Sequence, residues 1–202
     1  MQTLEQRMTP PELLVHIGQL LFDKNLVDIS GGNISMRQGD ALFFTPTGSG
    51  PLYHWCLGEE NIVQGNIKET QSLLDDPRFT KEGHSHLAIY QEFPSVNGII
   101  HAHPKYLFPF LAKEAPLPPV LRSNDSYGEL QYHEAAEPYS EDQAKKIVKV
   151  FRGQEDRLKT KGAAVLMPRH GIIVAAKNLL VALDCLDRIH NNAFAVLFGK
   201  LI

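Results

Sequence analysis

The most constraining feature of this 202-residue chain is an apolar run that ends on two histidines. The run extends from Val96 to His103, between two prolines, and has the length and composition of a β-strand. Side chains two residues apart in a strand point to the same face of the sheet. The imidazoles of His101 and His103 would then share one face and could both reach one ion. Imidazole is a usual ligand of zinc and similar divalent metals, so the pattern favours a Lewis-acid site.

Composition excludes several classes of protein. Hydrophobic residues make up 43% of the chain, charged residues 21%, and the net charge is −3, so we expect a soluble globular protein without a nucleic-acid or membrane partner. Residues 1–7 lack an apolar signal core, and no run approaches 18 apolar residues. Cys56 and Cys185 are too few and too far apart for a disulfide framework, which suggests a reducing cytoplasm. The length suits a single domain over residues 1–202.

Capping residues and hydrophobic spacing predict the main helices. Thr9 and Glu12 form a capping box for a helix that ends near residues 23–25, and Ser140 and Gln143 form a second box for a helix through Phe151. Further helices are predicted over residues 83–93 and after the cap Asn178. Short strands are predicted at residues 34–36, 41–45, 163–167 and 172–176, whereas the proline-rich segment 104–139 is predicted to be largely irregular with one or two short strands. This mixture predicts an α/β/α three-layer sandwich with a mostly antiparallel central sheet.

Two further residues are candidates for the site. His170 occupies a tight turn before Gly171, and three imidazoles would leave a fourth metal position open, as catalytic zinc requires. Glu82, at the start of a predicted helix, is a candidate acid or base. Each residue also has an ordinary structural explanation. His170 suits a turn, Glu82 suits a helix N-terminus, and paired histidines also occur as hydrogen-bonded core residues.

Small and polar residues add a possible anion-binding surface. Ser30-Gly31-Gly32-Asn33 and Thr47-Gly48 offer backbone N–H groups that together could form an anion nest, although such turns are common. His84 and His86 are about 200° apart on a helix, so they cannot easily share one ion. We expect His86 to face inward near the site and His84 to face solvent.

Taken together, these segments resemble the class II aldolase/adducin family, and the resemblance covers nearly the whole chain in order. The segments that carry it are Ser30–Arg37, Thr45–Gly48, Glu82 followed by His86–Tyr90 and His101–Pro104, and Arg169–Gly171. The resemblance implies a metal, usually zinc, held by His101, His103 and His170. It also implies that Glu82 transfers the proton, and that Gly32, Asn33, Thr47 and Gly48 line a phosphate pocket.

The implied activity is that of an aldolase-type lyase. Such an enzyme cleaves a C–C bond of a small sugar or sugar phosphate through a zinc-stabilised enediolate. Family members are commonly cyclic tetramers with sites near subunit interfaces, so the resemblance implies a homo-oligomer.

The chain also departs from the family pattern. Thr80 and Lys81 stand where the family has two small residues, and both become candidate substrate-binding residues, Lys81 as a point charge for phosphate or carboxylate. Arg122 stands where the aldolases carry a tyrosine, with Tyr127 or Tyr132 as possible substitutes. The exact substrate therefore stays open, and a metal-dependent epimerase, dehydratase or decarboxylase would also fit the pattern. A non-enzymatic adducin-like module fits the fold but not the four site residues.

Overall fold

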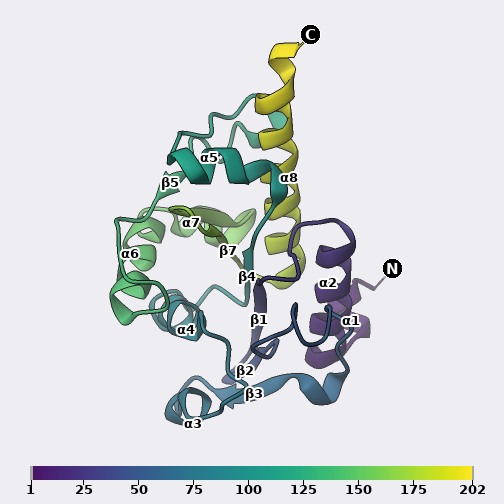
Figure 1. Cartoon of the computed structure of the whole chain (residues 1–202). Helices are drawn as coiled ribbons and strands as arrows, with labels where there is room; N and C mark the ends of the chain where they lie inside the picture. The colour runs from purple at the N-terminus through teal and green to yellow at the C-terminus, as the bar shows by residue number, and fades with distance from the viewer. Residues whose placement is uncertain (1, 202) are drawn as a thin grey trace.

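The computed structural model describes residues 2–201, and within them one sheet runs through the centre of the molecule (Figure 1). Its seven strands lie in the order β3-β2-β1-β4-β7-β6-β5. Every neighbouring pair is antiparallel except β5 and β6, which confirms the prediction of a mostly antiparallel sheet. The strands are β1 (Asn33–Gln38), β2 (Ala41–Phe44), β3 (Val63–Asn66), β4 (Gly98–Ala102), β5 (Gln131–Tyr132), β6 (Ala163–Met167) and β7 (Gly171–Ala176).

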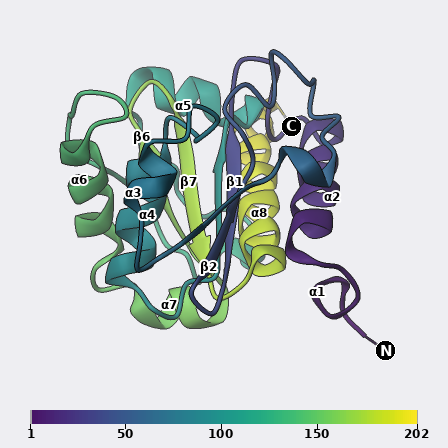
Figure 2. The same ribbon diagram turned by 90° about the horizontal axis from the view of Figure 1, so that it is seen from below.

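Helices cover both faces of this sheet, as the predicted three layers require (Figure 2). One apolar core joins the sheet to α2, α5 and α8, and the other joins it to α4, α6 and α7. Strand alternation sorts the side chains: Ile172 and Val174 enter the first core, and Ile173 and Ala175 enter the second. The helices are α1 (Leu4–Arg7), α2 (Pro10–Asp23), α3 (Gln71–Leu74), α4 (Gly83–Glu92), α5 (Phe108–Lys113), α6 (Glu141–Phe151), α7 (Glu155–Thr160) and α8 (Leu179–Phe198). Across residues 2–201, none of them combines the length and apolarity needed to cross a membrane.

The helix caps follow the sequence prediction with one difference. Thr9 and Glu12 make both bonds of a capping box, and the Asn178 side chain accepts a hydrogen bond from the backbone N–H of the third residue of α8. Ser140 Oγ accepts from Gln143 N at 3.1 Å, but the Gln143 side chain accepts from the backbone N–H of Tyr139 at 2.9 Å. The second predicted capping box is therefore only half formed, because the Gln143 amide reaches one residue further back.

Several elements differ from the sequence prediction. The strand predicted over residues 96–103 is shorter, so His103 lies beyond its end, where its backbone N–H donates to the carbonyl of Leu26 at 3.0 Å. The segment 104–139 contains α5 as well as the short strand β5. The elements β3, α3 and α7 were not predicted, because they are short and their sequences carry little apolar periodicity. Single-turn 3₁₀ helices lie at Glu59–Asn61, Lys105–Leu107, Arg122–Asn124 and Gly199–Leu201.

A buried polar network lies between α4 and β1. His86 Nδ1 is 2.7 Å from Ser35 Oγ, which in turn is 2.8 Å from Tyr90 Oη. All three side chains are buried, and burial lowers the pKa of His86 from 6.5 to about 3. His86 thus faces inward as expected. Its ring bonds to Ser35 of β1, and it does not belong to the cluster of His101, His103 and His170. His84, two residues earlier in α4, is partly exposed.

This burial predicts a pH-dependent stability. A histidine whose pKa is depressed by folding binds more protons in the unfolded chain, so stability falls as the pH drops below 6.5 toward about 3. Between pH 7 and pH 5, the wild type should lose about 2 kcal/mol more unfolding free energy than His86→Gln. Urea unfolding in the presence of a chelator measures this difference. His84→Gln, which removes a half-exposed ring of the same helix, should behave as the wild type, and equal losses in all three proteins would contradict the assignment.

Candidate active site and metal centre

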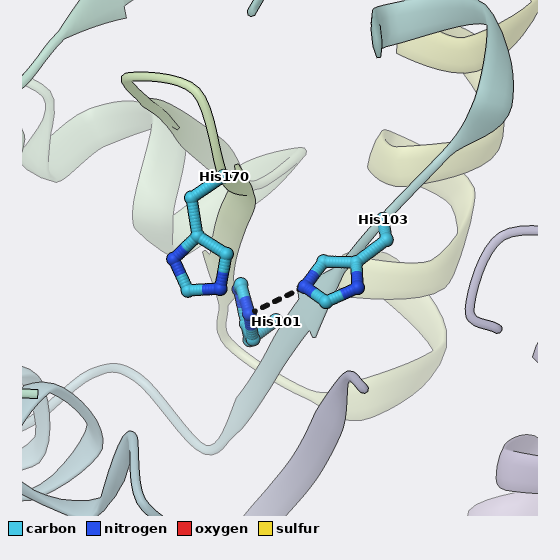
Figure 3. Close-up of side chains that lie close together, drawn as sticks. All are labelled: His101, His103 and His170. Atoms are coloured by element: carbon cyan, nitrogen blue, oxygen red, sulfur yellow. Dashed lines mark hydrogen bonds between the residues drawn. The ribbon is translucent and has the colours of Figure 1, made fainter. Parts of the chain in front are cut away.

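Three imidazoles converge where the end of β4 meets the start of β7, in the interior of the sheet order (Figure 3). His101 lies in β4, His103 follows its end, and His170 lies in the turn between β6 and β7. One nitrogen from each ring lies within 4.8 Å of the other two. The segments meet because β4 and β7 pair antiparallel, with Ala102 opposite Ile172. The end of β4 therefore lies beside the start of β7, where His170 precedes Gly171.

The geometry of the three rings fits a divalent metal. His101 Nδ1 lies 3.1 Å from the carbonyl oxygen of Ile172, to which an Nδ1–H donates, and this leaves Nε2 free as a ligand. His101 Nε2 is 3.1 Å from His103 Nε2, close to the roughly 3.3 Å between two nitrogens bound to one tetrahedral zinc. Burial, helped by the neighbouring imidazoles, holds the pKa of His101 well below 6.5, and it lowers that of His170 to about 4. Neutral imidazole is the form that binds metal.

Glu82 stands beside these rings. Its Oε1 lies 3.9 Å from His101 Nε2 and 3.8 Å from His170 Nδ1. Because both rings are neutral, these contacts are not ion pairs. The side chain is 2% exposed, and neither carboxylate oxygen has a hydrogen-bond partner among the described residues. Although Glu82 is the N-cap of α4, its side chain makes no capping hydrogen bond, so helix stabilisation does not explain its position. Burial raises the pKa of Glu82 to about 7, near the value that suits proton transfer at neutral pH.

A cavity of about 350 Å³ opens over the imidazoles and Glu82. It is lined by all six residues that the sequence suggested for substrate binding: Gly32, Asn33, Thr47, Gly48, Thr80 and Lys81. The Asn33 Oδ1 atom is buried without a hydrogen-bond partner among the described residues. Gly32 and Gly48 have φ angles of +105° and +77°, and a Cβ at Gly32 would lie 2.7 Å from the Val27 side chain. At Gly32 and Gly48 the backbone itself therefore forms the wall of the cavity, with no side chain of its own in front of it.

Three of the sequence candidates lie elsewhere. Arg122 is exposed in a 3₁₀ helix and is not among the residues that line the cavity. The hydroxyl of Tyr127 donates to the carbonyl of Lys161 at 3.2 Å, and that of Tyr132 donates to the carbonyl of Ala115 at 3.0 Å. Neither tyrosine is among the residues that line the cavity, and both hydroxyl groups bond to other parts of the fold.

Two residues at the site were missed. Tyr139 lines the cavity, with its ring 6.1 Å from that of His170 and edge-on to it, and Lys81 Nζ lies 5.8 Å from the centre of its ring. Tyr139 also has a φ of +66°, which is unusual for a tyrosine and often marks a functional site. Asp28 contacts His103, with Oδ1 3.4 Å from Nδ1. The one local signal for it was an Asp placed two residues before a Ser-Gly turn.

Several known proteins are similar to this chain in sequence. L-fuculose phosphate aldolase of Methanocaldococcus jannaschii is 28% identical over 193 residues, covering 93% of this chain and 96% of that protein. 3-oxo-tetronate 4-phosphate decarboxylase of Haemophilus influenzae is 28% identical over 204 residues, covering 95% and 89%. The chain spans about half the length, 54%, of the L-fuculose phosphate aldolases of Methanococcus maripaludis that it matches at 35–38% identity.

Solved structures share the fold. An L-fuculose 1-phosphate aldolase superposes with a TM-score of 0.79 at 24% identity, covering 100% of this chain and 89% of that one. At this identity the likeness shows the fold alone. The family model described as "Class II Aldolase and Adducin N-terminal domain" matches residues 12–196. The chain therefore belongs to the class II aldolase and adducin family, whose named relatives here are aldolases and decarboxylases.

Proposed function

We propose that this chain is a divalent-metal-dependent lyase, a zinc enzyme of the class II aldolase type. It would cleave a C–C bond of a small sugar or sugar phosphate, with Glu82 as the proton-transfer group. The observation that carries the proposal is the convergence of three imidazoles beside a buried carboxyl group that has no hydrogen-bond partner among the described residues. Structural sites rarely bury such a carboxyl group without compensation, because burial of an unpaired charge destabilises the fold.

His101, His103 and His170 would hold the ion. When bound, it would supply a Lewis acid that polarises a carbonyl group and offsets developing negative charge. Three neutral imidazoles add no charge of their own, so the full charge of the ion would face the substrate. The fourth ligand position would open into the cavity that these residues line.

Glu82 is suited to move protons in both directions. When an aldol C–C bond breaks, a hydroxyl group of one fragment loses a proton and a carbon of the other fragment gains one. A carboxyl group with a pKa of about 7 can accept the first proton and supply the second at neutral pH. The low exposure of Glu82 keeps competing water away from it.

The opposite wall of the cavity suits an anionic group on the substrate. Asn33, Thr47 and Thr80 offer polar side chains, the backbone at Gly48 is open, and Lys81 provides a cation. Together these groups would bind a phosphate or carboxylate and hold the reacting carbons near the imidazoles.

Decarboxylation is a second candidate. It is favoured by the decarboxylase relative that matches most of the chain, and by the Lys81 cation at the cavity. Loss of CO₂ from a 3-oxo acid also leaves negative charge beside a carbonyl group, so the same residues would serve.

A panel of phosphorylated and free ketoses and 3-oxo acids, assayed for aldehyde and for CO₂, distinguishes the two reactions. Epimerisation or dehydration would release neither product, and an adducin-like interaction module would turn over no substrate at all.

The setting of the enzyme is part of the proposal. We propose a single domain over residues 1–202, a homotetramer by analogy with the family, and a cytoplasmic location. The location rests on the cysteines, since Cys56 and Cys185 are both free thiols.

Metal content tests the site. The purified protein should contain about one zinc or similar ion per chain, because a three-histidine site holds a single ion. His101→Ala should remove it, as measured by elemental analysis after gel filtration. An unchanged metal content in His101→Ala would show that the ion lies elsewhere, and absence of metal from the reconstituted wild type would favour a non-enzymatic, adducin-like role.

Glu82→Gln tests the proton-transfer role. This variant should keep the metal but lose turnover by roughly 10²–10⁴-fold. Because burial raises the pKa of Glu82 from 4.5 to about 7, the wild type loses stability as the pH rises from about 4.5 to about 7, and the metal-free variant at pH 8 should be more stable than the wild type by roughly 1–3 kcal/mol. Glu129→Gln removes an exposed carboxylate and should change neither property. Normal turnover in Glu82→Gln would show that another group moves the proton.

Lys81→Met tests the anion site. For the substrate that the panel identifies, its KM should rise roughly 10-fold with little change in kcat, because a charged contact common to ground and transition states is lost. Lys177→Met, which removes an exposed cation after β7, serves as the control and should leave both constants unchanged. An unaltered KM in Lys81→Met would place the anion elsewhere.

A further inference from the structure

We propose that Asp28 is a positioning residue of the metal centre: its carboxylate orients His103 and strengthens that imidazole as a ligand. This inference rests on the proposed metal site and adds to it a residue that the sequence comparison did not indicate. Asp28 Oδ1 lies 3.4 Å from His103 Nδ1, on the side of the ring opposite the Nε2 that faces His101. An Nδ1–H can therefore donate to the carboxylate while Nε2 keeps its lone pair toward the other imidazoles.

Asp28 is itself held rigidly. The same Oδ1 accepts hydrogen bonds from the backbone N–H groups of Ser30 and Gly31, both at 2.9 Å, and from the Ser30 hydroxyl at 2.7 Å. Its backbone carbonyl accepts from the indole N–H of Trp55 at 3.0 Å. Trp55 is fully buried and has a φ of +63°, so this contact is fixed by the core. A carboxylate anchored at these points can hold a ring in one orientation.

The same segment also packs against the imidazole. A Cβ at Gly31 would lie 2.8 Å from His103 Cε1, so the backbone there lies directly against the ring. The backbone N–H of His103 donates to the carbonyl of Leu26, two residues before Asp28. His103 lies beyond the end of β4, so strand pairing does not orient it as it orients His101. Residues 26–31 thus supply the orientation that the sheet no longer gives.

The group that faces Nδ1, the ring nitrogen turned away from the proposed metal, differs between His101 and His103. His101 faces a neutral carbonyl, whereas His103 faces a carboxylate. A carboxylate that accepts the proton of Nδ1 makes Nε2 more basic and a better metal ligand. It also adds a negative charge beside a set of three neutral ligands. Loss of such an outer contact typically weakens metal binding by about 10–100-fold.

Asp28→Asn is the direct test, because asparagine keeps the shape and can still accept from the two backbone N–H groups. Zn²⁺ affinity, measured by competition with a chromophoric chelator, should fall about 10–100-fold. The visible absorption spectrum of the Co²⁺-loaded protein should change as well, since it reports ligand geometry. Ser30→Ala removes one of the hydrogen bonds that anchor the same oxygen but keeps the carboxylate, so it should weaken Zn²⁺ binding much less than Asp28→Asn does. Asp23→Asn, which removes a nearby exposed carboxylate, should bind Zn²⁺ as the wild type does.

A second readout needs no metal. In the metal-free protein, imidazole ¹⁵N resonances of His103 should shift in Asp28→Asn and shift much less in Ser30→Ala, where the carboxylate remains. Wild-type zinc affinity in Asp28→Asn would overturn the proposal, and so would equal weakening in Asp28→Asn and Ser30→Ala, which would mean that only the loop matters. The His101→Ala variant tests the metal site separately: if the proposed site were wrong, this variant would retain its metal. If Asp28→Ala fails to fold by circular dichroism, the asparagine variant still decides the question.

Discussion

The antiparallel pairing of β4 with β7 is the interaction on which the site depends. Residues His101 and His170 are far apart in the sequence, and they meet because Ala102 pairs with Ile172. Both strands are buried on both faces, and their apolar side chains alternate between two helical layers. A shift of one residue in this register would exchange every buried side chain between the layers, so the cores hold the imidazoles in place.

The site carries polar groups that a structural core would avoid. Glu82 and His101 are each about 2% exposed, and the Glu82 oxygens have no partner among the described residues. The surrounding fold compensates through the paired strands and two apolar cores. A carboxyl group held ready near neutral pH is therefore a cost in stability that the proposed proton transfer explains.

Much of the fold was predictable because its elements carry local signals. The helix α2 has a complete capping box, α8 has an asparagine cap, and β6 and β7 are continuous apolar runs. The edge strand β3 has the sequence Val-Gln-Gly-Asn and lacks such a signal. The helix α5 lies in a proline-rich segment, and its six residues are too few to show a helical spacing of apolar side chains.

The site residues also fall into two groups, those with a local sequence signal and those placed by contacts between distant segments. The His-x-His pair is local, whereas the position of His170 depends on strand pairing and was inferred from the family resemblance. Tyr139 and Asp28 were missed because their places beside the site come from tertiary contacts, with the His170 ring in one case and the Trp55 indole in the other. The correspondence of Arg122 with the family tyrosine stays a prediction, since the irregular segment around it gives no periodicity by which to align it.

The most direct test of the proposed centre is X-ray absorption at the zinc edge of the metal-loaded protein. Three imidazoles predict three nitrogen ligands at about 2.0–2.1 Å with the outer-shell scattering of imidazole rings, and a further light-atom ligand in the open position. Fewer than three imidazole contributions, or sulfur at about 2.3 Å from a cysteine, would contradict the assignment of His101, His103 and His170 as the metal site.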